Sequence, residues 1–421
     1  MTTPEVVAGL PNATGDRPAI QTSSPFRVLR HPNFRLLWFG TLVSNSGDWM
    51  DQIALNWLVL TMTGSPIYLG LLNLCRSGPI LLFTLLGGAV ADRFERRRLM
   101  MVTQTGAMLT AIGLGVVAFS GGSIWLVLVL ATLRGVLMSV NLPARQALIS
   151  ELVPRDDLMA AISLNSATLN VSRVLGPSIG GILIATVGVA GAFFLNAASF
   201  LAVIYGLYQM KGLPPRPNAP EEPVWRSVVD GLVYLKGDRV LRELLVVGLA
   251  PLVLGMSYQP MLAVFAKDVL AVGSVGLGVM MSAAGLGAVV GALGVGMIAN
   301  GVTRGRLMFG GMALFGLTLL GFALSGTLWV SALALFGVGV GSSIYQALNN
   351  SLVQQHAPDA MRGRIMSMLF LTRGFVPLGA MAAGAGAALV SAPATMALFA
   401  LLILLLTAVG LISSPTIRDL P

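Results

Sequence analysis

The sequence predicts an all-α membrane protein in which twelve transmembrane helices form two pseudo-symmetric six-helix halves. The chain has 421 residues, of which 55% are hydrophobic and 10% charged, whereas a soluble domain carries about 25% charged residues. Apolar runs of membrane-spanning length follow one another along most of the chain. A weak repeat relates the two halves.

Each membrane span needs about 20 apolar residues to cross a bilayer core of about 30 Å. We expect spans near 34–60, 66–91, 99–119, 123–144, 159–186 and 188–210, and then near 243–266, 274–300, 306–325, 327–350, 364–390 and 392–413. The predicted organisation is a disordered tail (1–33), a first half (34–210), a linker (211–242), a second half (243–414) and a short tail (415–421).

Basic residues lie in alternate connections between these spans. One set of connections includes Arg93, Arg145, Lys211, Arg304 and Arg362, whereas the opposite set carries only Lys267, which has Asp268 beside it. Connections rich in Lys and Arg face the cytoplasm. The sequence therefore predicts a multi-pass protein of the cell membrane with both termini and the linker in the cytoplasm.

Several functional classes are disfavoured by composition. The formal net charge of +9 could suggest nucleic acid, but the basic residues are spread over short connections and do not form one basic face. The only Cys is Cys75 and the only His are His31 and His356, so we expect no metal site and no cofactor. Neither a nucleophile–histidine pair nor a nucleotide-binding motif is present in the spans, so we do not expect an enzyme.

The repeat appears in three matched regions in the same order. Arg96, Arg98, Leu99 and Met100 recur as Arg304, Arg306, Leu307 and Met308; Pro154 recurs as Pro358; Arg173 and Pro177 recur as Arg373 and Pro377. Two parallel six-helix halves are a known plan of secondary transporters, which hold the substrate between the halves near the middle of the membrane.

Polar residues inside the first span form a stripe. Asn45, Asp48, Gln52 and Asn56 lie at spacings that share one helix face, and Asp51 lies at its edge. Further polar residues in later spans are Arg76, Arg134, Asn170, Arg173 and Arg373. In the fourth span, Arg134, Met138, Asn141 and Arg145 share one helix face. Charge at membrane depth costs several kcal/mol, so such residues are functional candidates by default.

We expect these residues to line a central water-filled cavity. Asp48 is the first candidate for a proton carrier and Asp51 the second, with Arg134 or Arg76 tuning the protonation of Asp48 by proximity. The alternative is a static ion pair that fixes the helices together, and Asp51 could also lie near the outer surface. Two aspartates against four arginines leave an excess of two positive charges, which favours an anionic cargo unless some arginines extend to water at the membrane surface.

The connection from Gly87 to Arg98 carries the strongest local motif. It resembles the loop motif of the major facilitator superfamily, in which a glycine is followed by Asp-Arg and a basic cluster. The resemblance implies that Gly88 permits close helix packing, that Asp92 caps a helix of the other half, and that Arg93, Arg96 and Arg97 form a charge network at the inner gate. Glu95 stands where the family usually has a glycine.

A second motif lies in the fifth span, where Gly176, Pro177, Gly180 and Gly181 resemble the core of the motif that marks antiporters in this superfamily. Proline removes a backbone hydrogen bond and bends the helix, while glycines let a neighbouring helix approach. Ser163 and Ser172 stand where the family has glycines.

The chain from about residue 25 to 415 resembles the major facilitator superfamily, and residues 33–38 and 63–66 look closest to its branch of enterobactin exporters and macrolide-efflux proteins, the transmembrane secretion effectors. The resemblance implies a monomer that exports a small molecule by alternating access, in exchange for protons. An uptake symporter would share the fold, and a membrane receptor or scaffold without transport remains a further alternative.

Overall fold

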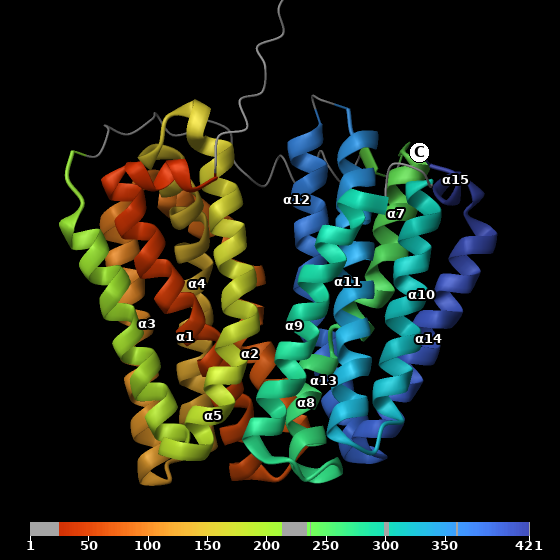
Figure 1. The fold of residues 1–421 in the computed structure, drawn as a ribbon, viewed down its shortest axis with the longest axis horizontal. Helices are drawn as coiled ribbons and strands as arrows, with labels where there is room; N and C mark the ends of the chain where they lie inside the picture. Colours follow the sequence, from red (N-terminus) through yellow and green to blue (C-terminus); the bar gives the residue numbers. More distant parts are fainter. Residues whose placement is uncertain (1–24, 213–233, 236, 299–302, 359–360, 421) are drawn as a thin grey trace, which may run out of the picture.

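The structure is a computed structural model that describes residues 25–212, 234–235, 237–298, 303–358 and 361–420. These residues are almost entirely helical, and no β-strand occurs among them. Figure 1 shows two groups of long helices standing side by side with their axes roughly parallel. The predicted all-α fold class is confirmed.

The N-terminal half comprises a short 3-10 helix and five long helices. They are η1 (Pro25–Arg30), α1 (Pro32–Thr63), α2 (Pro66–Arg93), α3 (Arg96–Ser120), α4 (Ile124–Leu152) and α5 (Arg155–Gln209). Gly188 interrupts α5 with a φ of 76°, which a residue without a Cβ adopts readily. The chain reverses there, so α5 contains two antiparallel crossings.

The C-terminal half contains more irregular segments. Its helices are α7 (Arg239–Ala250), α8 (Tyr258–Val264), α9 (Gly273–Ile298), α10 (Arg304–Ala323), α11 (Leu328–His356), α12 (Arg362–Thr372), α13 (Val376–Leu389), α14 (Ala392–Ser413) and α15 (Pro415–Arg418). The π-helical turns η2 (Pro251–Gly255) and η3 (Phe265–Val269) lie on either side of α8, and the 3-10 turn η4 (Arg373–Phe375) joins α12 to α13.

In the described part of the chain, nine helical segments are long and apolar enough to cross a membrane. Because one of these segments, α5, crosses twice, the nine segments supply ten crossings. Two further crossings are α1, which carries the polar stripe, and the segment α12–α13, which is broken at η4. This arrangement agrees with the twelve predicted spans.

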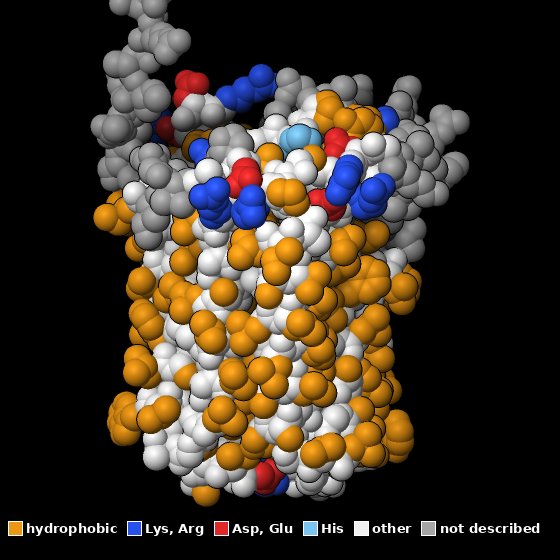
Figure 2. Space-filling model, turned by 90° about the vertical axis from the view of Figure 1, so that its right-hand side faces the viewer, with side chains coloured by type: hydrophobic (Ala, Val, Ile, Leu, Met, Phe, Trp, Pro, Cys, Tyr) orange, Lys and Arg blue, Asp and Glu red, His pale blue; other side chains and the backbone are white. Residues whose placement is uncertain are grey.

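The outer surface has the polarity of a membrane protein. On the face shown in Figure 2, apolar side chains cover the long middle zone, while Lys, Arg, Asp and Glu gather mainly at one end. We call this the arginine-rich end; Arg96 and Arg306 lie in it, and both described chain ends lie there (Figure 1). The opposite end, which contains Gly64, Gly121 and Gly188, is the far end.

The two halves meet through two helix pairs, α5 with α9 and α2 with α13. Figure 1 shows them converging at the far end and splaying apart toward the arginine-rich end. Small residues permit the contact: a Cβ on Gly181 would lie 2.6 Å from the Ser274 carbonyl oxygen, and one on Gly384 would lie 2.6 Å from the Pro66 carbonyl oxygen. Such close backbone approach is typical of packed membrane helices.

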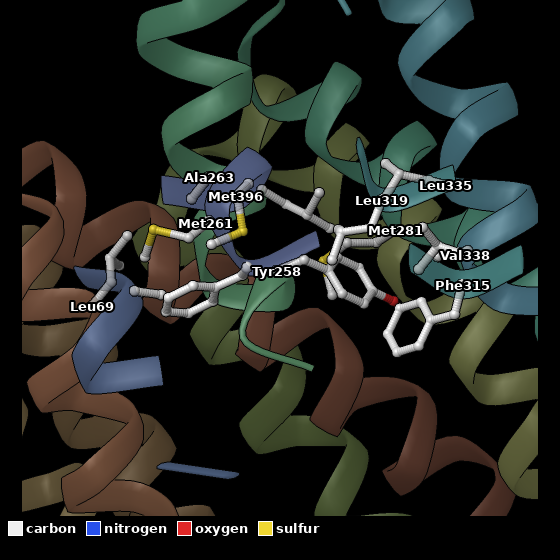
Figure 3. Packing of buried hydrophobic residues seen from close by; sticks show 14 of the residues in the cluster. Leu69, Tyr258, Met261, Ala263, Met281, Phe315, Leu319, Leu335, Val338 and Met396 are labelled. Atoms are coloured by element: carbon white, nitrogen blue, oxygen red, sulfur yellow. The ribbon is translucent and has the colours of Figure 1, made fainter. Parts of the chain in front are cut away.

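The largest cluster of buried apolar residues includes members of both halves, and Leu69 of α2 lies near Tyr258 and Met261 of α8 (Figure 3). In the C-terminal half, Phe315 and Leu319 of α10 lie beside Leu335 and Val338 of α11 (Figure 3), and all four side chains are fully buried. Dense packing of this kind resists deformation.

Parts of both predicted tails are ordered against the bundle. Val28 of η1 is fully buried, and Arg30 and His31 bind the Asp157 carboxylate of α5 at 2.8 and 2.7 Å. At the other terminus, Ile417 of α15 is fully buried. The expected disordered tail therefore does not include residues 25–31, because apolar burial and ion pairs fix them; residues 1–24 lie outside the described residues, as does most of the linker.

Candidate functional site

The predicted polar stripe of α1 lies inside the N-terminal half. Asn45, Asp51 and Asn56 are buried, while Asp48 and Gln52 are half-buried. The helical repeat places these residues on one side of α1, where arginines from α2 and α4 meet them.

Asp48 forms an ion pair with Arg134 of α4. The Arg134 side chain is only 3% exposed; it also donates from Nη1 to the Ala107 carbonyl oxygen at 3.1 Å and lies 4.8 Å from the centre of the Phe200 ring. Its Nε has no hydrogen-bond partner among the described residues. Arg134 is thus held from three sides, and Asp48 joins α1 to α4 through it.

Asp51 forms a second pair, with Arg76 of α2, at 3.2 Å between Oδ2 and Nη1. Its side chain is 1% exposed, and its other oxygen, Oδ1, has no partner in the described part of the chain. Asp51 therefore lies in the interior of the half, not near an outer surface.

Arg145 joins the same cluster from α4, donating to the Asn45 Oδ1 at 3.0 Å. Spacing predicts Arg145 on the face of the fourth span that carries Arg134, and α4, which continues to Leu152, carries it into the bundle. The acid–base cluster thus consists of Asp48, Asp51, Arg76, Arg134 and Arg145.

The two aspartates differ in their access to solvent. The Asp48 side chain is 19% exposed and the Asp51 side chain is 1% exposed. A carboxylate that water can reach is able to exchange a proton without unfolding its surroundings. Asp48 has the geometry of an exchangeable acid, whereas Asp51 has that of a fixed counterion to Arg76.

The remaining predicted cavity residues lie outside this cluster. Asn170 is exposed and donates to the Ser166 carbonyl oxygen of its own helix at 3.1 Å. Arg173 lines a pocket between the halves with Trp49, Tyr258 and Gln259. Arg373 lines a separate pocket within the C-terminal half. The structure thus divides the predicted single constellation into three places.

The predicted arginine network lies at the arginine-rich end of the N-terminal half. Arg96 pairs with Glu151 of α4, and Arg97 donates to the Tyr208 carbonyl oxygen of α5 at 2.9 Å. Arg93 is exposed at the last turn of α2. These contacts join α3 to α4 and α5.

The surroundings of Gly88 and Asp92, two residues of the loop motif, lie outside the part of the molecule that the structure describes. The neighbouring Gly87 shows the close approach that we expected of Gly88: a Cβ there would lie 2.2 Å from the Ser139 carbonyl oxygen of α4. Helices α2 and α4 are therefore in backbone contact at this glycine.

The glycines of the fifth-span motif face two different neighbours. A Cβ on Gly176 would meet the Trp49 Cβ at 2.6 Å, and one on Gly180 would meet the Met50 Cα at 3.0 Å, both in α1. Gly181 faces α9 of the other half. Pro177, whose carbonyl oxygen would lie 2.7 Å from a Cβ on Gly278, completes this contact. The motif is a packing surface that joins α5 to α1 and to the opposite half.

In the part of the chain that the structure describes, no group of three His, Cys, Asp or Glu side chains is placed to hold a metal ion. The fold and the buried charges define a membrane transporter of the major facilitator type: two helical halves, joined through glycine-rich contacts, with ion pairs inside the membrane-spanning region.

The chain belongs to the transmembrane secretion effector family, whose profile matches residues 23–418. Three relatives illustrate it. The multidrug efflux pump Tap of Mycobacterium tuberculosis is 31% identical over 407 residues, covering 93% of this chain and 95% of that protein. The enterobactin exporter EntS of Shigella flexneri is 30% identical (80% of each chain), and the staphyloferrin A transporter of Staphylococcus aureus is 28% identical (80% and 84%).

Solved structures share the fold at low sequence identity. A POT family transporter in complex with 5-aminolevulinic acid superposes with a TM-score of 0.74 at 13% identity, covering 91% of this chain and 96% of that one. A bacterial homologue of the human lysosomal transporter Spinster gives 0.70 at 14% identity, covering 92% and 96%. The major facilitator architecture is thereby confirmed.

Proposed function

We propose that this protein is a proton-coupled exporter that moves a small molecule out of the cell by alternating access. Efflux is favoured by the relatives, among which an enterobactin exporter and a multidrug efflux pump are similar over 80% or more of the chain. Proton coupling is favoured by one observation above all: Asp48 is a partly exposed carboxylate in a buried ion pair.

Asp48 is proposed to carry the proton. Deprotonated, it binds Arg134 and ties α1 to α4; protonated, it loses the charge that holds this pair, and the tie weakens. A proton that binds at one membrane face and leaves at the other would thus change the packing of the N-terminal half once per cycle. In the second pair, the Asp51 carboxylate is enclosed, and this pair is proposed to remain intact.

The orientation follows from the distribution of arginines. We propose that the arginine-rich end faces the cytoplasm, because basic connections remain on that side. The halves then meet on the outer side and part toward the cytoplasm, which suits loading of cargo from inside the cell. Rocking of the two halves would separate the contacts of α5 with α9 and of α2 with α13. The outer side would then open while the cytoplasmic side closes.

Transport by inside-out membrane vesicles tests this function. Vesicles energised by respiration are screened with antibiotics, dyes and siderophores, and we expect at least one compound to accumulate inside and an uncoupler to abolish the accumulation. The Asp48→Asn variant should lose gradient-driven accumulation by at least tenfold. The matched control is Asp156→Asn, an exposed acid of α5, which should transport like the wild type.

The alternatives give different results when transport is compared between inside-out and right-side-out vesicles. Accumulation only in right-side-out vesicles would establish an uptake symporter. Full gradient-driven transport by Asp48→Asn would show that Asp48 is a static partner of Arg134 and that the proton is carried elsewhere.

A further inference from the structure

We propose that Lys267 is a latch that holds the two halves together at the far end and is released once in each transport cycle. The inference rests on the alternating access of the proposed function, but not on the identity of the cargo or of the proton carrier. It makes Lys267 a positioning residue, which acts on the balance between two conformations and not through contact with the cargo.

Lys267 belongs to the C-terminal half and reaches across to the N-terminal half. It lies in η3, and its Nζ donates to the Leu60 carbonyl oxygen of α1 at 3.2 Å in a partly buried position. The hydrogen bonds that join α5 to α9 involve only serine side chains and backbone carbonyl oxygens. The bond from Lys267 has a charged donor, and charged donors make the stronger hydrogen bonds.

The acceptor lies at the C-terminal end of α1, where a helix carries partial negative charge. The last turn of α1 contains no basic residue of its own. The Leu60 oxygen also accepts the N–H of Gly64 at 2.9 Å, which closes the helix, and a carbonyl oxygen has a second lone pair for the ammonium group. The other half thus supplies the cation that α1 lacks, and separation of the halves at the far end removes it.

The position of Lys267 in the chain is unusual. The predicted connections at the far end contain no other Lys or Arg, because basic residues are normally kept in cytoplasmic connections. The neighbouring Asp268 is exposed to solvent, where salt screens its charge. A lysine at this end therefore requires a reason of its own, and the contact with α1 provides one.

The backbone that carries Lys267 is irregular. In the π-helical turn η3, the Leu270 N–H binds the Phe265 carbonyl oxygen at 2.8 Å, and π turns are frequent at functional sites. Directly after it, Ala271 has a φ of 53°, the only positive φ of a non-glycine residue in the described part of the chain. A Cβ disfavours this conformation, and strained residues cluster at switch regions. The connection is therefore strained while the far end is closed.

The contact and the strain act on closure in opposite directions. The bond from Lys267 to α1 stabilises the closed far end, whereas relaxation of Ala271 favours its opening. A latch balanced in this way can close firmly and still release. Removing one feature or the other should shift the conformational equilibrium in opposite directions.

Labelling of one buried thiol in the purified full-length protein measures how often the far end opens. In a Cys75→Ser background, Ser274→Cys places a thiol at the contact of α9 with α5, where the serine is 7% exposed, so a bulky maleimide reacts only after opening. When closing is fast relative to labelling, the rate follows the open population. We expect Lys267→Met to raise the rate about fivefold, Lys267→Arg to stay close to the parent protein, and Ala271→Gly to lower the rate about fivefold.

A matched control and a second readout separate a latch from a local structural role. Lys211→Met, which neutralises an exposed lysine of the arginine-rich end, should label like the parent protein. A latch also moves the other end, so Lys267→Met should shorten the distance between spin labels at Met159 and Gln355. Faster labelling without this shortening would mean that Lys267 only holds its surroundings in place.

Two further results would overturn the inference. An unchanged labelling rate in Lys267→Met would refute the latch, and an unchanged or higher rate in Ala271→Gly would refute the role of the strained connection. If labelling is unchanged in Lys267→Met yet gradient-driven export occurs, the latch fails and the proposed function stands. If Lys267→Met shifts both ends but no gradient-driven transport is found, the latch stands and the proposed function fails.

Discussion

At the scale of single residues, Asp48 and Asp51 show how position on one helix separates two roles. They lie three residues apart on α1, and each meets an arginine from a different helix. The exposed fraction of the side chain, 19% against 1%, makes only Asp48 accessible to water. Asp48 is therefore the residue that we propose for proton exchange.

The Asp48–Arg134 pair should contribute to stability mainly by satisfying two buried charges. Arg134→Gln leaves the carboxylate without its partner, and we expect a loss of about 3 kcal/mol in the free energy of unfolding. Adding Asp48→Asn should restore at least half of this loss, because no unpaired charge then remains. Denaturant unfolding of the four proteins in a double-mutant cycle measures the coupling. Strictly additive losses would show that the two side chains do not interact.

The sequence could identify most of this cluster but not its pairing. Helical spacing grouped Asn45, Asp48 and Gln52 on one face, and the cost of buried charge singled out Arg76 and Arg134. Which arginine faces which aspartate depends on how α2 and α4 pack around α1, and spacing within one helix does not specify that. Arg145 lies with Arg134 on the face of the fourth span where spacing places it, although α4 extends eight residues beyond the predicted end of that span, at 144.

At the scale of elements, helix boundaries were predictable where glycine or proline sets them and not elsewhere. Gly64 and Gly121, with φ of 62° and 69°, end α1 and α3, close to the predicted ends at 60 and 119. The π turn η2 runs from Pro251 to Gly255 and still lies inside the span predicted at 243–266, because a proline and a glycine do not distinguish a π turn from a continuous helix. The π turn η3 (Phe265–Val269) contains neither residue. The short helix α15 was predicted as a tail because four residues leave no periodicity.

The C-terminal helix α15 should remain docked until strongly acidic pH. Hydrogen bonds from Arg418 and Arg306 lower the pKa of Asp419 from 3.8 to about 2. A group with a lowered pKa stabilises the folded state above its ordinary pKa and loses this contribution as pH falls through the lowered one. The docked helix should therefore be unaffected from pH 8 to 5 and loosen between about pH 4 and 2.

Spin-label mobility at position 420 measures this docking, in a Leu420→Cys variant with Cys75 replaced by Ser. Adding Asp419→Asn should raise the mobility already at pH 7. A label at exposed Phe119 of the far end is the control for general unfolding at low pH. Equal mobility of the label at pH 7 with and without the Asp419→Asn substitution would show that this carboxylate does not hold the helix.

At the scale of the whole molecule, small residues line the contacts of α5 with α9 and of α2 with α13, and few hydrogen bonds join the two halves. Ser178 and Ser282 meet at 2.6 Å, Ser274 donates to the Gly181 carbonyl oxygen at 3.1 Å, and Lys267 donates to the Leu60 carbonyl oxygen at 3.2 Å. Contacts of this kind can separate and re-form at modest cost, unlike the apolar packing inside each half.

A methyl group at this interface should disturb transport more than one on the lipid-facing surface. Gly181→Ala places a Cβ 2.6 Å from the Ser274 carbonyl oxygen, whereas Gly310→Ala meets no described atom within 4 Å. We expect at least a fivefold loss of vesicle transport for Gly181→Ala, with increased labelling of cysteines introduced at the far end, and near wild-type behaviour for Gly310→Ala. Equal transport by the two variants would mean that far-end closure is not part of the cycle.

Distances between spin labels in the purified protein test alternating access driven by Asp48 most directly. In a Cys75→Ser background, one pair at Met62 and Val269 reports the far end, and a second at Met159 and Gln355 reports the arginine-rich end. We predict that raising the pH lengthens one distance distribution while it shortens the other, and that Asp48→Asn abolishes this response. Distances that stay fixed, or a pH response unchanged in Asp48→Asn, would contradict the proposal.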